Sequence, residues 1–185
     1  MRRLRRRGPR EVRLFEDETD LLLLPPLRAA WGRRGEAREV RLSGANARRV
    51  VFGALNIDTG RRLFLARKRQ RAEDFCEFLR LARRAYRSWD LLMLLDEDSS
   101  HTAGASQDTA WELDIELVWL PKRCPQLNGL ERLWGHGKDH VCANRQGQGI
   151  DAEAGRFIRY LSGLPNREAL HQGGLLSDDW WLRNV

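Results

Sequence analysis

The chain has 185 residues, 42% of them hydrophobic, which suits one globular domain with a sizeable core. Its formal net charge of +7 and isoelectric point near 10.1 favour a polyanionic partner, most simply nucleic acid. No apolar run approaches the ~20 residues that cross a bilayer, so the sequence excludes a spanning helix and we expect no membrane partner.

The positive charge comes almost wholly from arginine, because only Lys68, Lys122 and Lys138 are lysines. Arginine suits bidentate contacts with phosphate, yet genomes rich in G and C produce the same bias, and the composition leaves both causes open. The three cysteines form no CxxC pair, which indicates a reducing compartment. Residues 1–10 form a basic segment that is either a phosphate-binding arm or the remnant of a linker from a longer protein.

The N-terminal part of the chain predicts one strand followed by an irregular segment. A strand-like run at residues 12–15 leads into Glu16-Asp17-Glu18-Thr19, so we expect an acidic cluster where the first strand ends. Paired prolines and several glycines then indicate an irregular excursion between Leu21 and Gly44.

A hairpin and a helix come next. Two β-rich runs, residues 49–57 and 61–66, flank a turn that ends in Gly60, a pattern typical of an antiparallel hairpin. Between residues 71 and 87 apolar side chains recur every three or four positions, which predicts an amphipathic helix with an arginine-rich outer face. We expect that face and the basic segment to contact nucleic-acid phosphates without reading sequence.

Two more strands are predicted in the second half of the chain. The apolar run 91–95 delivers Asp96 at its C-terminal end, and a helical interval separates it from a second strand at 115–120. Such intervals supply the crossovers that parallel strands need. The order strand, hairpin, helix, strand, helix, strand, helix is that of an α/β, ribonuclease H-like fold, in which helices flank a mixed central sheet.

The C-terminal segment predicts two helices. The first begins at Asp151 and stops at Ser162-Gly163, and a shorter one spans residues 165–171. The apolar ending Trp180-Trp181-Leu182 is expected to dock on the core, although an exposed ending would form a partner site.

Three acids form the candidate site. Asp17 and Asp96 each end a predicted strand, and open α/β sheets place their sites outside such ends. Glu131 opens a helix on which Trp134 and Lys138, at i+3 and i+7, share its face. Carboxylates are preferred ligands of hard divalent cations, and two Mg²⁺ ions suit phosphodiester cleavage. Like charges this close make sense with metal bound, although each acid taken singly could be a solvated loop residue.

The order of these motifs resembles a known family. A first acid lies in Asp-Glu-Thr at 17–19, and Asp96 is followed by His101 and by Leu120-Pro121. Then comes Pro125-x-Leu127-Asn128-x-x-Glu131-x-x-Trp134-x-x-x-Lys138. The pattern is similar to DDE transposases of the mariner superfamily, with the closest likeness to the bacterial insertion sequence 630 family. The 34 residues at 97–130 that separate the second and third acids match that family's spacing.

The resemblance implies that Asp17, Asp96 and Glu131 are catalytic residues and ligands of two Mg²⁺ ions, for which Mn²⁺ can substitute. It also implies a set of residues that contact DNA or support the acids: His101, Asn128, Trp134, Lys138, Lys122 and Arg123. Three of them have plainer interpretations, since His101 could be a surface residue, Asn128 a helix cap and Trp134 part of the core.

The acids beside the matched positions are expected to be exposed flanks; they are Glu18, Glu97 and Asp98. The chain also departs from the family's pattern. Glu97 replaces the Asn common at that place, and Gly129 stands where the family tends to have Pro.

The resemblance therefore implies the catalytic domain of an insertion-sequence transposase, a Mg²⁺-dependent endonuclease that cleaves DNA and transfers strands at element ends. We expect this catalytic domain at residues 11–145, a helical extension packed on it at 146–185, and a linker remnant at 1–10.

Expected partners are the element ends, the target DNA, and either a second copy as a homodimer or an upstream helix-turn-helix transposase part. The expected location is the bacterial cytoplasm, in association with the nucleoid. The alternative is an inactive or truncated remnant that acts only as a DNA-binding or transposase-interacting domain.

Overall fold

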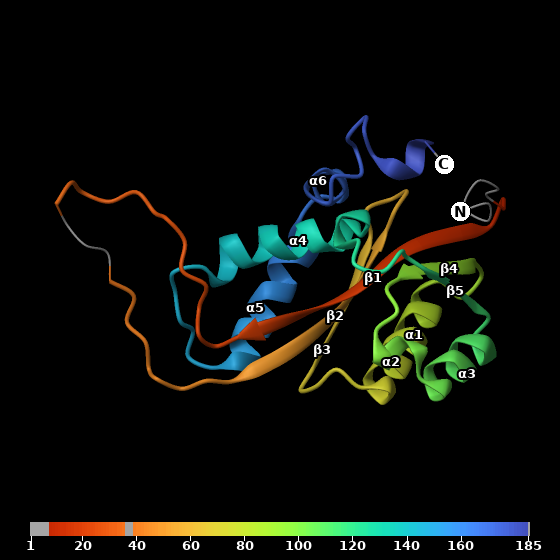
Figure 1. Cartoon of the computed structure of the whole chain (residues 1–185), viewed down its shortest axis with the longest axis horizontal. Helices are drawn as coiled ribbons and strands as arrows, with labels where there is room; N and C mark the ends of the chain where they lie inside the picture. Colours follow the sequence, from red (N-terminus) through yellow and green to blue (C-terminus); the bar gives the residue numbers. More distant parts are fainter. Residues whose placement is uncertain (1–7, 36–38, 185) are drawn as a thin grey trace.

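The computed structural model describes residues 8–35 and 39–184, and its centre is a five-stranded mixed sheet (Figure 1). The strand order is β3-β2-β1-β4-β5. β1 pairs antiparallel with β2 and parallel with β4, β2 pairs antiparallel with β3, and β4 pairs parallel with β5. The strands are β1 (Glu11–Leu22), β2 (Arg48–Asn56), β3 (Arg62–Arg67), β4 (Asp90–Leu95) and β5 (Ile115–Trp119). This is the mixed sheet that the order of predicted elements requires.

Helices cover both faces of the sheet (Figure 1). One face carries α1 (Ala72–Ala85), α2 (Ser99–Thr102) and α3 (Gly104–Glu112). The other carries α4 (Gly129–Gly137), which continues into a π-helical turn (Lys138–Cys142), then α5 (Ile150–Gly163) and α6 (Asn166–Gln172). Short 3-10 turns occupy Pro125–Leu127 and Trp181–Asn184. Each face of the sheet therefore has its own hydrophobic cluster.

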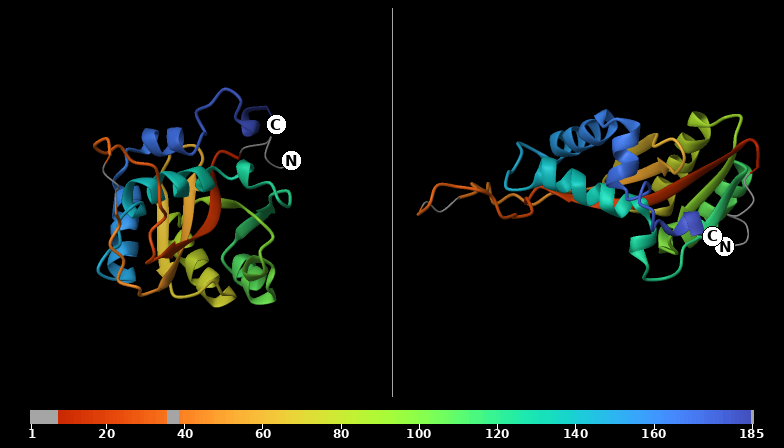
Figure 2. Two further views of the ribbon diagram at one scale, coloured as in Figure 1. Left: turned by 60° about the vertical axis from the view of Figure 1, so that its left-hand side comes forward. Right: turned by 90° about the horizontal axis from the view of Figure 1, so that it is seen from above.

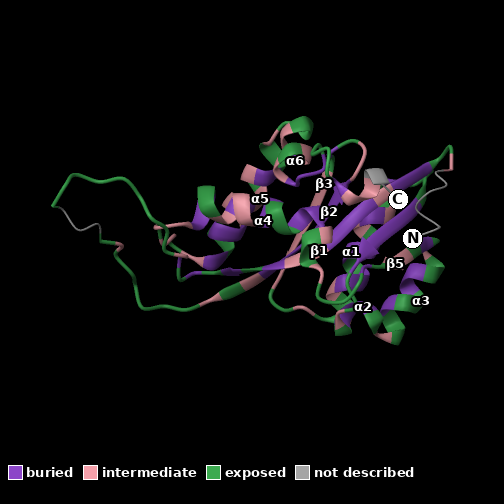
Figure 3. Cartoon of the chain, turned by 45° about the horizontal axis from the view of Figure 1, so that its top comes forward, coloured by how far each residue is buried: buried purple, intermediate pink, exposed green. Residues whose placement is uncertain are grey.

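The two clusters follow from the alternation of side chains along the strands. Leu14 of β1 packs toward α1, whereas Phe15, its neighbour, packs toward α4 and α5. Both side chains are fully buried, as are most residues of the central strands, while the outer faces of the helices are exposed (Figure 3). Residues 16 and 18 therefore face the α1 side and residue 17 faces the α4 side.

β1 is longer than the sequence predicts, and Asp17 does not end it. The strand continues to Leu22 because residues 14–22 pair with β2 along their whole length. Its pairing with β4 stops at Phe15, opposite Leu94, so the following residues of β1 have no strand partner on that edge. Asp17 consequently lies within a strand but beside the point where β4 ends.

The predicted irregular excursion is present between β1 and β2 and extends away from the body of the molecule (Figures 1 and 2). Its described residues include Trp31, which is 97% exposed. The chain returns to the sheet where the Leu23 amide donates a hydrogen bond to the Ala47 carbonyl, 2.8 Å away.

The C-terminal segment packs on the α4 side of the sheet. Phe157 and Leu161 of α5 are fully buried in the same cluster as Phe15. The rings of Trp180 and Phe15 meet edge-on, with their centroids 5.7 Å apart. The Trp181 indole donates a hydrogen bond to the Leu127 carbonyl, 2.9 Å away. The expectation that the apolar ending docks on the core is confirmed.

Most of the basic segment predicted at residues 1–10 lies outside the described residues. Within the described part of the chain, no helix has the length and apolar character needed to cross a membrane.

Candidate active site

Asp17, Asp96 and Glu131 line one pocket of about 100 Å³. The three acids come from three separate elements: the middle of β1, the residue after β4, and the first turn of α4. Asp17 is half-buried and the other two are exposed. The remaining lining is formed by Leu120, Pro121, Arg123, Cys124, Pro125 and Asn128. The structure therefore brings together the acids that the sequence pattern selects.

Asn128 fixes the helix that carries Glu131. Its side chain accepts a hydrogen bond from the Leu130 amide at 3.1 Å, which caps the N-terminus of α4. Its amide group also donates to the Glu16 carbonyl of β1 at 2.7 Å. The predicted cap is confirmed, and the second bond ties the start of α4 to the strand that bears Asp17.

Asp17 is held by a tryptophan from the same helix. The Trp134 indole donates a hydrogen bond from Nε1 to Asp17 Oδ2 at 3.0 Å. Burial raises the pKa of Asp17 well above its usual value, and the negative charges of Glu131, Glu18 and Asp96 raise it further. A bound cation would relieve this repulsion, so the donor set fits a hard divalent ion.

Asp96 is held from the opposite side by His101. The imidazole Nδ1 lies 3.1 Å from Asp96 Oδ1 and 3.1 Å from the Asp96 carbonyl. This hydrogen bond lowers the pKa of Asp96, outweighing the effect of partial burial. Asp96 is therefore ionised and oriented at the pocket, and His101 is not the surface residue that the plainer interpretation allows.

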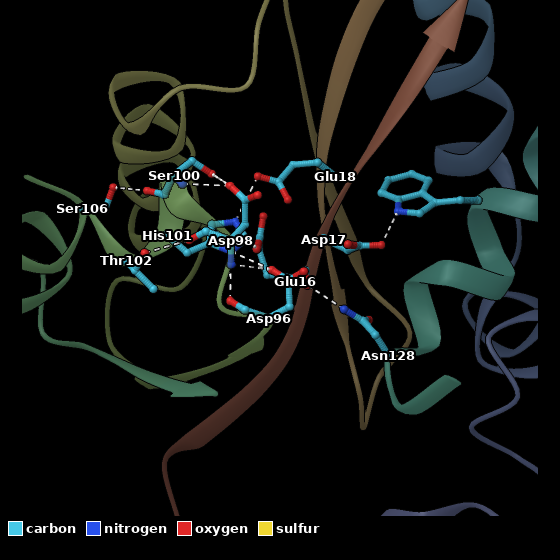
Figure 4. A network of polar contacts seen from close by, with 11 residues as sticks. Glu16, Asp17, Glu18, Asp96, Asp98, Ser100, His101, Thr102, Ser106 and Asn128 are labelled. Atoms are coloured by element: carbon cyan, nitrogen blue, oxygen red, sulfur yellow. Dashed lines mark hydrogen bonds and ion pairs between the residues drawn. The ribbon is translucent and has the colours of Figure 1, made fainter. Parts of the chain in front are cut away.

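A second charged cluster lies behind the pocket, on the α1 side of β1 (Figure 4). His101 Nε2 lies 3.0 Å from Glu18 Oε1 and 3.4 Å from Glu16 Oε2. Burial lowers the pKa of His101, but Glu16, Asp96 and Glu18 outweigh it and raise the pKa to about 12. The imidazole is consequently a buried cation surrounded by carboxylates.

Glu16 is the most enclosed member of this cluster. It is fully buried, and neither carboxylate oxygen has a hydrogen-bond partner, although His101 pairs with it by charge. Burial and the charge of Glu18 raise the pKa of Glu16 well above its usual value. The sequence interpretation missed this residue, because it placed residues 16–19 in an acidic cluster after the strand-like run 12–15, whereas Glu16 lies inside β1.

One ligand atom from each of Glu16, Glu18 and His101 lies within 4.8 Å of the others. Among the described residues this is the one group of three that is close enough to hold a single ion. The pKa of His101 favours a proton at that position. Asp17, Asp96 and Glu131 line one pocket but do not form such a group.

The remaining candidates fall in different places. Trp134 is 2% exposed and packs on Phe157, so it belongs to the core and supports Asp17 instead of stacking on DNA. Lys138 lines a separate pocket with Asp20, whereas Glu131 lines the pocket of Asp17 and Asp96. Trp134 fills the space above Gly53 on β2.

The loop before α4 places its two basic residues differently. Lys122 is exposed and pairs with Glu97 at 2.9 Å. Arg123 lines the pocket and has a φ of 58°, a left-handed conformation that is uncommon for a residue other than glycine. Arg123 is thus the basic residue that lies at the acids.

The expectation of exposed flanking acids holds for Glu97 alone. Glu18 is buried against His101, and its side chain is only 6% exposed. Asp98 caps α2 by accepting hydrogen bonds from the Ser100 amide and hydroxyl. Alternation along a longer β1 places Glu18 inside, and the tight turn after β4 gives Asp98 its capping role.

The arginines of α1 also divide into two groups. Arg83 donates hydrogen bonds to the backbone carbonyls of Leu113, Asp114 and Trp89, so it joins α1 to the segments just before β5 and β4. Arg80 and Arg84 on α1, and Arg87 just after it, remain exposed. The predicted arginine face is therefore partly structural.

Comparison with known proteins decides the family. A family model described as DDE superfamily endonuclease matches residues 12–152, more than half of the chain. The chain belongs to this family. A relative from Shigella sonnei, the insertion element IS630 uncharacterized 39 kDa protein, is 27% identical over 134 residues. That match covers 71% of this chain and 39% of the relative. The predicted likeness to the insertion sequence 630 family is confirmed.

Solved structures confirm the fold. The Mos1 transposase paired-end complex with left transposon end has a TM-score of 0.71 and 15% identity, covering 97% of this chain and 56% of that one. The mariner Mos1 paired end complex with Mg has a TM-score of 0.70, 15% identity and coverage of 92% and 53%. The catalytic domain of Mos1 mariner transposase has a TM-score of 0.62, 13% identity and coverage of 91% and 78%. The α/β, ribonuclease H-like architecture is the one these proteins share, and this chain spans about half of the longer Mos1 chains.

Proposed function

We propose that this chain is the catalytic domain of an insertion-sequence transposase that cleaves DNA and transfers strands at element ends. The observation that carries the proposal is the convergence of Asp17, Asp96 and Glu131, from three separate elements, on one pocket. Membership of the DDE endonuclease family supports it.

Asp17, Asp96 and Glu131 would hold a pair of Mg²⁺ ions, or Mn²⁺ in their place. Bound ions of this kind activate the attacking oxygen and stabilise the leaving oxygen of a phosphodiester. The fit rests on the donor set, because carboxylates that repel one another at the pocket are stabilised by divalent cations. Mos1 paired-end complexes with Mg and with Mn support the same choice here.

The other residues of the pocket would orient the acids and the DNA. Trp134 and His101 hold Asp17 and Asp96 in place through one hydrogen bond each, so both acids are preorganised. Arg123 lines the pocket, and its guanidinium would contact a phosphate beside the cleaved bond. Lys122 and Lys138 would contact the DNA farther from the acids.

The assembly around this domain is also proposed. The partners would be the element ends and target DNA, with either a second copy of the chain or a helix-turn-helix part supplied from upstream. The domain would comprise residues 11–145 with a helical extension at 146–185, preceded by a basic linker at 1–10. It would work in the bacterial cytoplasm, at the nucleoid.

Nicking of supercoiled plasmid DNA in the presence of Mg²⁺ or Mn²⁺ tests the activity. Loss of a supporting residue around a metal site costs about 10–100-fold, so Glu131→Gln, which removes a direct ligand, should reduce nicking by more than that. Glu112→Gln, an exposed acid at the end of α3, is the matched control and should nick like the wild type. Equal nicking by Glu131→Gln and the wild type would assign the activity elsewhere, and a wild-type chain without nicking would favour the inactive remnant.

A further inference from the structure

A basic groove of about 670 Å³ lies away from the acids, where the end of β3 meets the N-terminal ends of α1 and α5. Five cations contribute to its lining: Arg49, Arg67, Lys68, Arg69 and Arg71. The acids of the lining are Asp74 and Asp151, so the groove carries an excess of positive charge.

Two of the five cations are already paired. Arg49 makes a bidentate contact with Asp151, at 2.7 and 2.8 Å, which joins the start of β2 to the start of α5. Arg67 bonds to Glu77 at 2.8 Å and lies 3.6 Å from Asp74, which joins the end of β3 to α1. These pairs hold the walls of the groove together.

The other three cations occupy the turn between β3 and α1. The side chains of Lys68, Arg69 and Arg71 are exposed and make no hydrogen bond or ion pair within the part of the chain that the structure describes, although the charge of Arg71 acts on Asp74. Three cations close together in sequence repel one another, and the single carboxylate of Asp74, which Arg67 shares, offsets only part of their charge. The local charge is therefore arranged for an anionic ligand outside the chain.

Strand register relates the groove to the candidate active site. Asp17 pairs with Gly53, Gly53 pairs with Phe64, and Arg67 follows Phe64 by three positions on β3. With strands ~4.8 Å apart and ~3.3 Å per residue, the backbone at Arg67 is about 14 Å from that at Asp17. This separation corresponds to about four base pairs along a DNA duplex. A duplex with one phosphate at the acids can therefore reach the groove.

We propose that the groove binds the phosphate backbone of the duplex DNA that flanks the cleaved bond, with Lys68, Arg69 and Arg71 as its free contacts. The proposal rests on the proposed function and gives it a DNA path across β2 and β3. An open groove lined by arginine and lysine suits successive backbone phosphates, which such contacts position without reading sequence. Arg49 and Arg67 shape the groove and add to its positive electrostatic potential.

The test compares two charge-matched double variants. Lys68→Ala with Arg69→Ala removes two free cations from the groove. Arg159→Ala with Arg167→Ala removes two exposed arginines, one from α5 and one from α6, whose side chains make no hydrogen bond or ion pair within the described residues. Binding of a duplex of random sequence is followed by fluorescence anisotropy over a range of salt concentrations, and thermal unfolding of each variant checks that it is folded.

The groove variant should bind more weakly, and the slope of log K against log salt should become shallower by about 1 to 2, since each phosphate contact contributes about 0.9. The variant of α5 and α6 should keep the wild-type slope.

Two results would overturn the proposal. Equal losses in both variants would mean that net charge alone governs binding, and wild-type binding by the groove variant would exclude the groove. A wild-type chain that nicks plasmid in a Glu131-dependent manner while the groove variant binds normally would reject the groove and leave the proposed function standing. A wild-type chain that binds no duplex at low salt would overturn both.

Discussion

On one face of β1, Asp17 shares a pocket with Asp96 and Glu131. On the other face, Glu16 and Glu18 surround His101 (Figure 4). Both faces gather carboxylates, but the cation of the buried face pairs directly with them. There the imidazolium balances part of the negative charge, and the cluster is enclosed by the core. Arg123 lines the pocket without pairing with Asp17, Asp96 or Glu131, so an ion or a ligand from outside would have to balance the charge of Asp17 and Glu131.

The difference teaches how one strand can serve two purposes. Alternation along β1 sends successive acids to opposite faces, so Asp17 faces the pocket while Glu16 and Glu18 contact His101, in the segment that follows β4. His101 links the two faces, because the same ring contacts Asp96 and Glu18. The buried cluster should therefore govern stability, and the pocket should govern metal binding.

Replacing His101 should produce the largest loss of stability. In His101→Leu the carboxylates of Glu16 and Glu18 stay buried without a cation, and breaking a buried ionic cluster in this way costs about 3–5 kcal/mol. Urea denaturation measures the free energy of unfolding. Adding Glu16→Gln to His101→Leu should recover part of the loss, because it removes one of the unpaired charges. A double variant no more stable than the single one would show that the cluster is not held by charge.

The same cluster predicts the direction of a pH effect. The folded chain keeps the proton of His101 up to a pKa of about 12, whereas the unfolded chain releases it near 6.5. The stability that His101 contributes is therefore complete below about pH 6.5 and decreases as pH rises toward 12, by up to about 1.4 kcal/mol per pH unit. Thermal unfolding of the wild type and of His101→Leu between pH 6 and pH 10 checks this, since the variant should lack this part of the slope.

The packing of Trp134 over Gly53 predicts the next largest change in stability. A Cβ atom at Gly53 would lie 2.4 Å from the Trp134 ring, the same ring that bonds to Asp17. Gly53→Ala should cost about 1–3 kcal/mol by overpacking and should also displace the indole from Asp17. Gly135→Ala is the control, because a Cβ there meets nothing within 4 Å and alanine favours the helix by up to about 1 kcal/mol. Opposite signs are expected for the two variants in the same denaturation assay.

The smallest expected effect is a gain in stability. Burial and neighbouring acids raise the pKa of Asp17, so its ionised form destabilises the fold when no metal is present. Asp17→Asn should therefore stabilise the metal-free chain, within the range of about 0.5–2 kcal/mol that single stabilising substitutions give. The gain should be absent below about pH 3.8 and should grow as pH rises through the raised pKa. Loss of stability in Asp17→Asn at neutral pH would contradict the account of the pocket.

Much of the fold could be predicted from the sequence because its signals are local. The apolar run before Asp96, the turn at Gly60 and the helical spacing of Phe75 and Phe78 each indicate an element without reference to the rest of the chain. The position of Asn128 before an apolar helical pattern likewise predicted its capping role. The three pocket acids were found through the resemblance, which supplied their order and spacing.

What the sequence could not supply depends on pairing between distant strands. The acidic run 16–20 is unfavourable in a strand, so it indicates an end, and only the nine-residue pairing with β2 carries β1 through to Leu22. The buried role of Glu16 and Glu18 follows from that extension. The contact between Trp134 and Asp17 depends on Gly53 of β2, which leaves room for the ring.

Direct measurement of Mn²⁺ binding tests the central claim, that the pocket acids bind divalent ions whereas the buried cluster does not. Electron paramagnetic resonance titrations would compare the wild type with Glu131→Gln, in the pocket, and Glu16→Gln, in the buried cluster. The account predicts at least a tenfold loss of affinity in Glu131→Gln and wild-type affinity in Glu16→Gln. Unchanged affinity in Glu131→Gln together with a loss in Glu16→Gln would contradict it and would place the metal on the opposite face of β1.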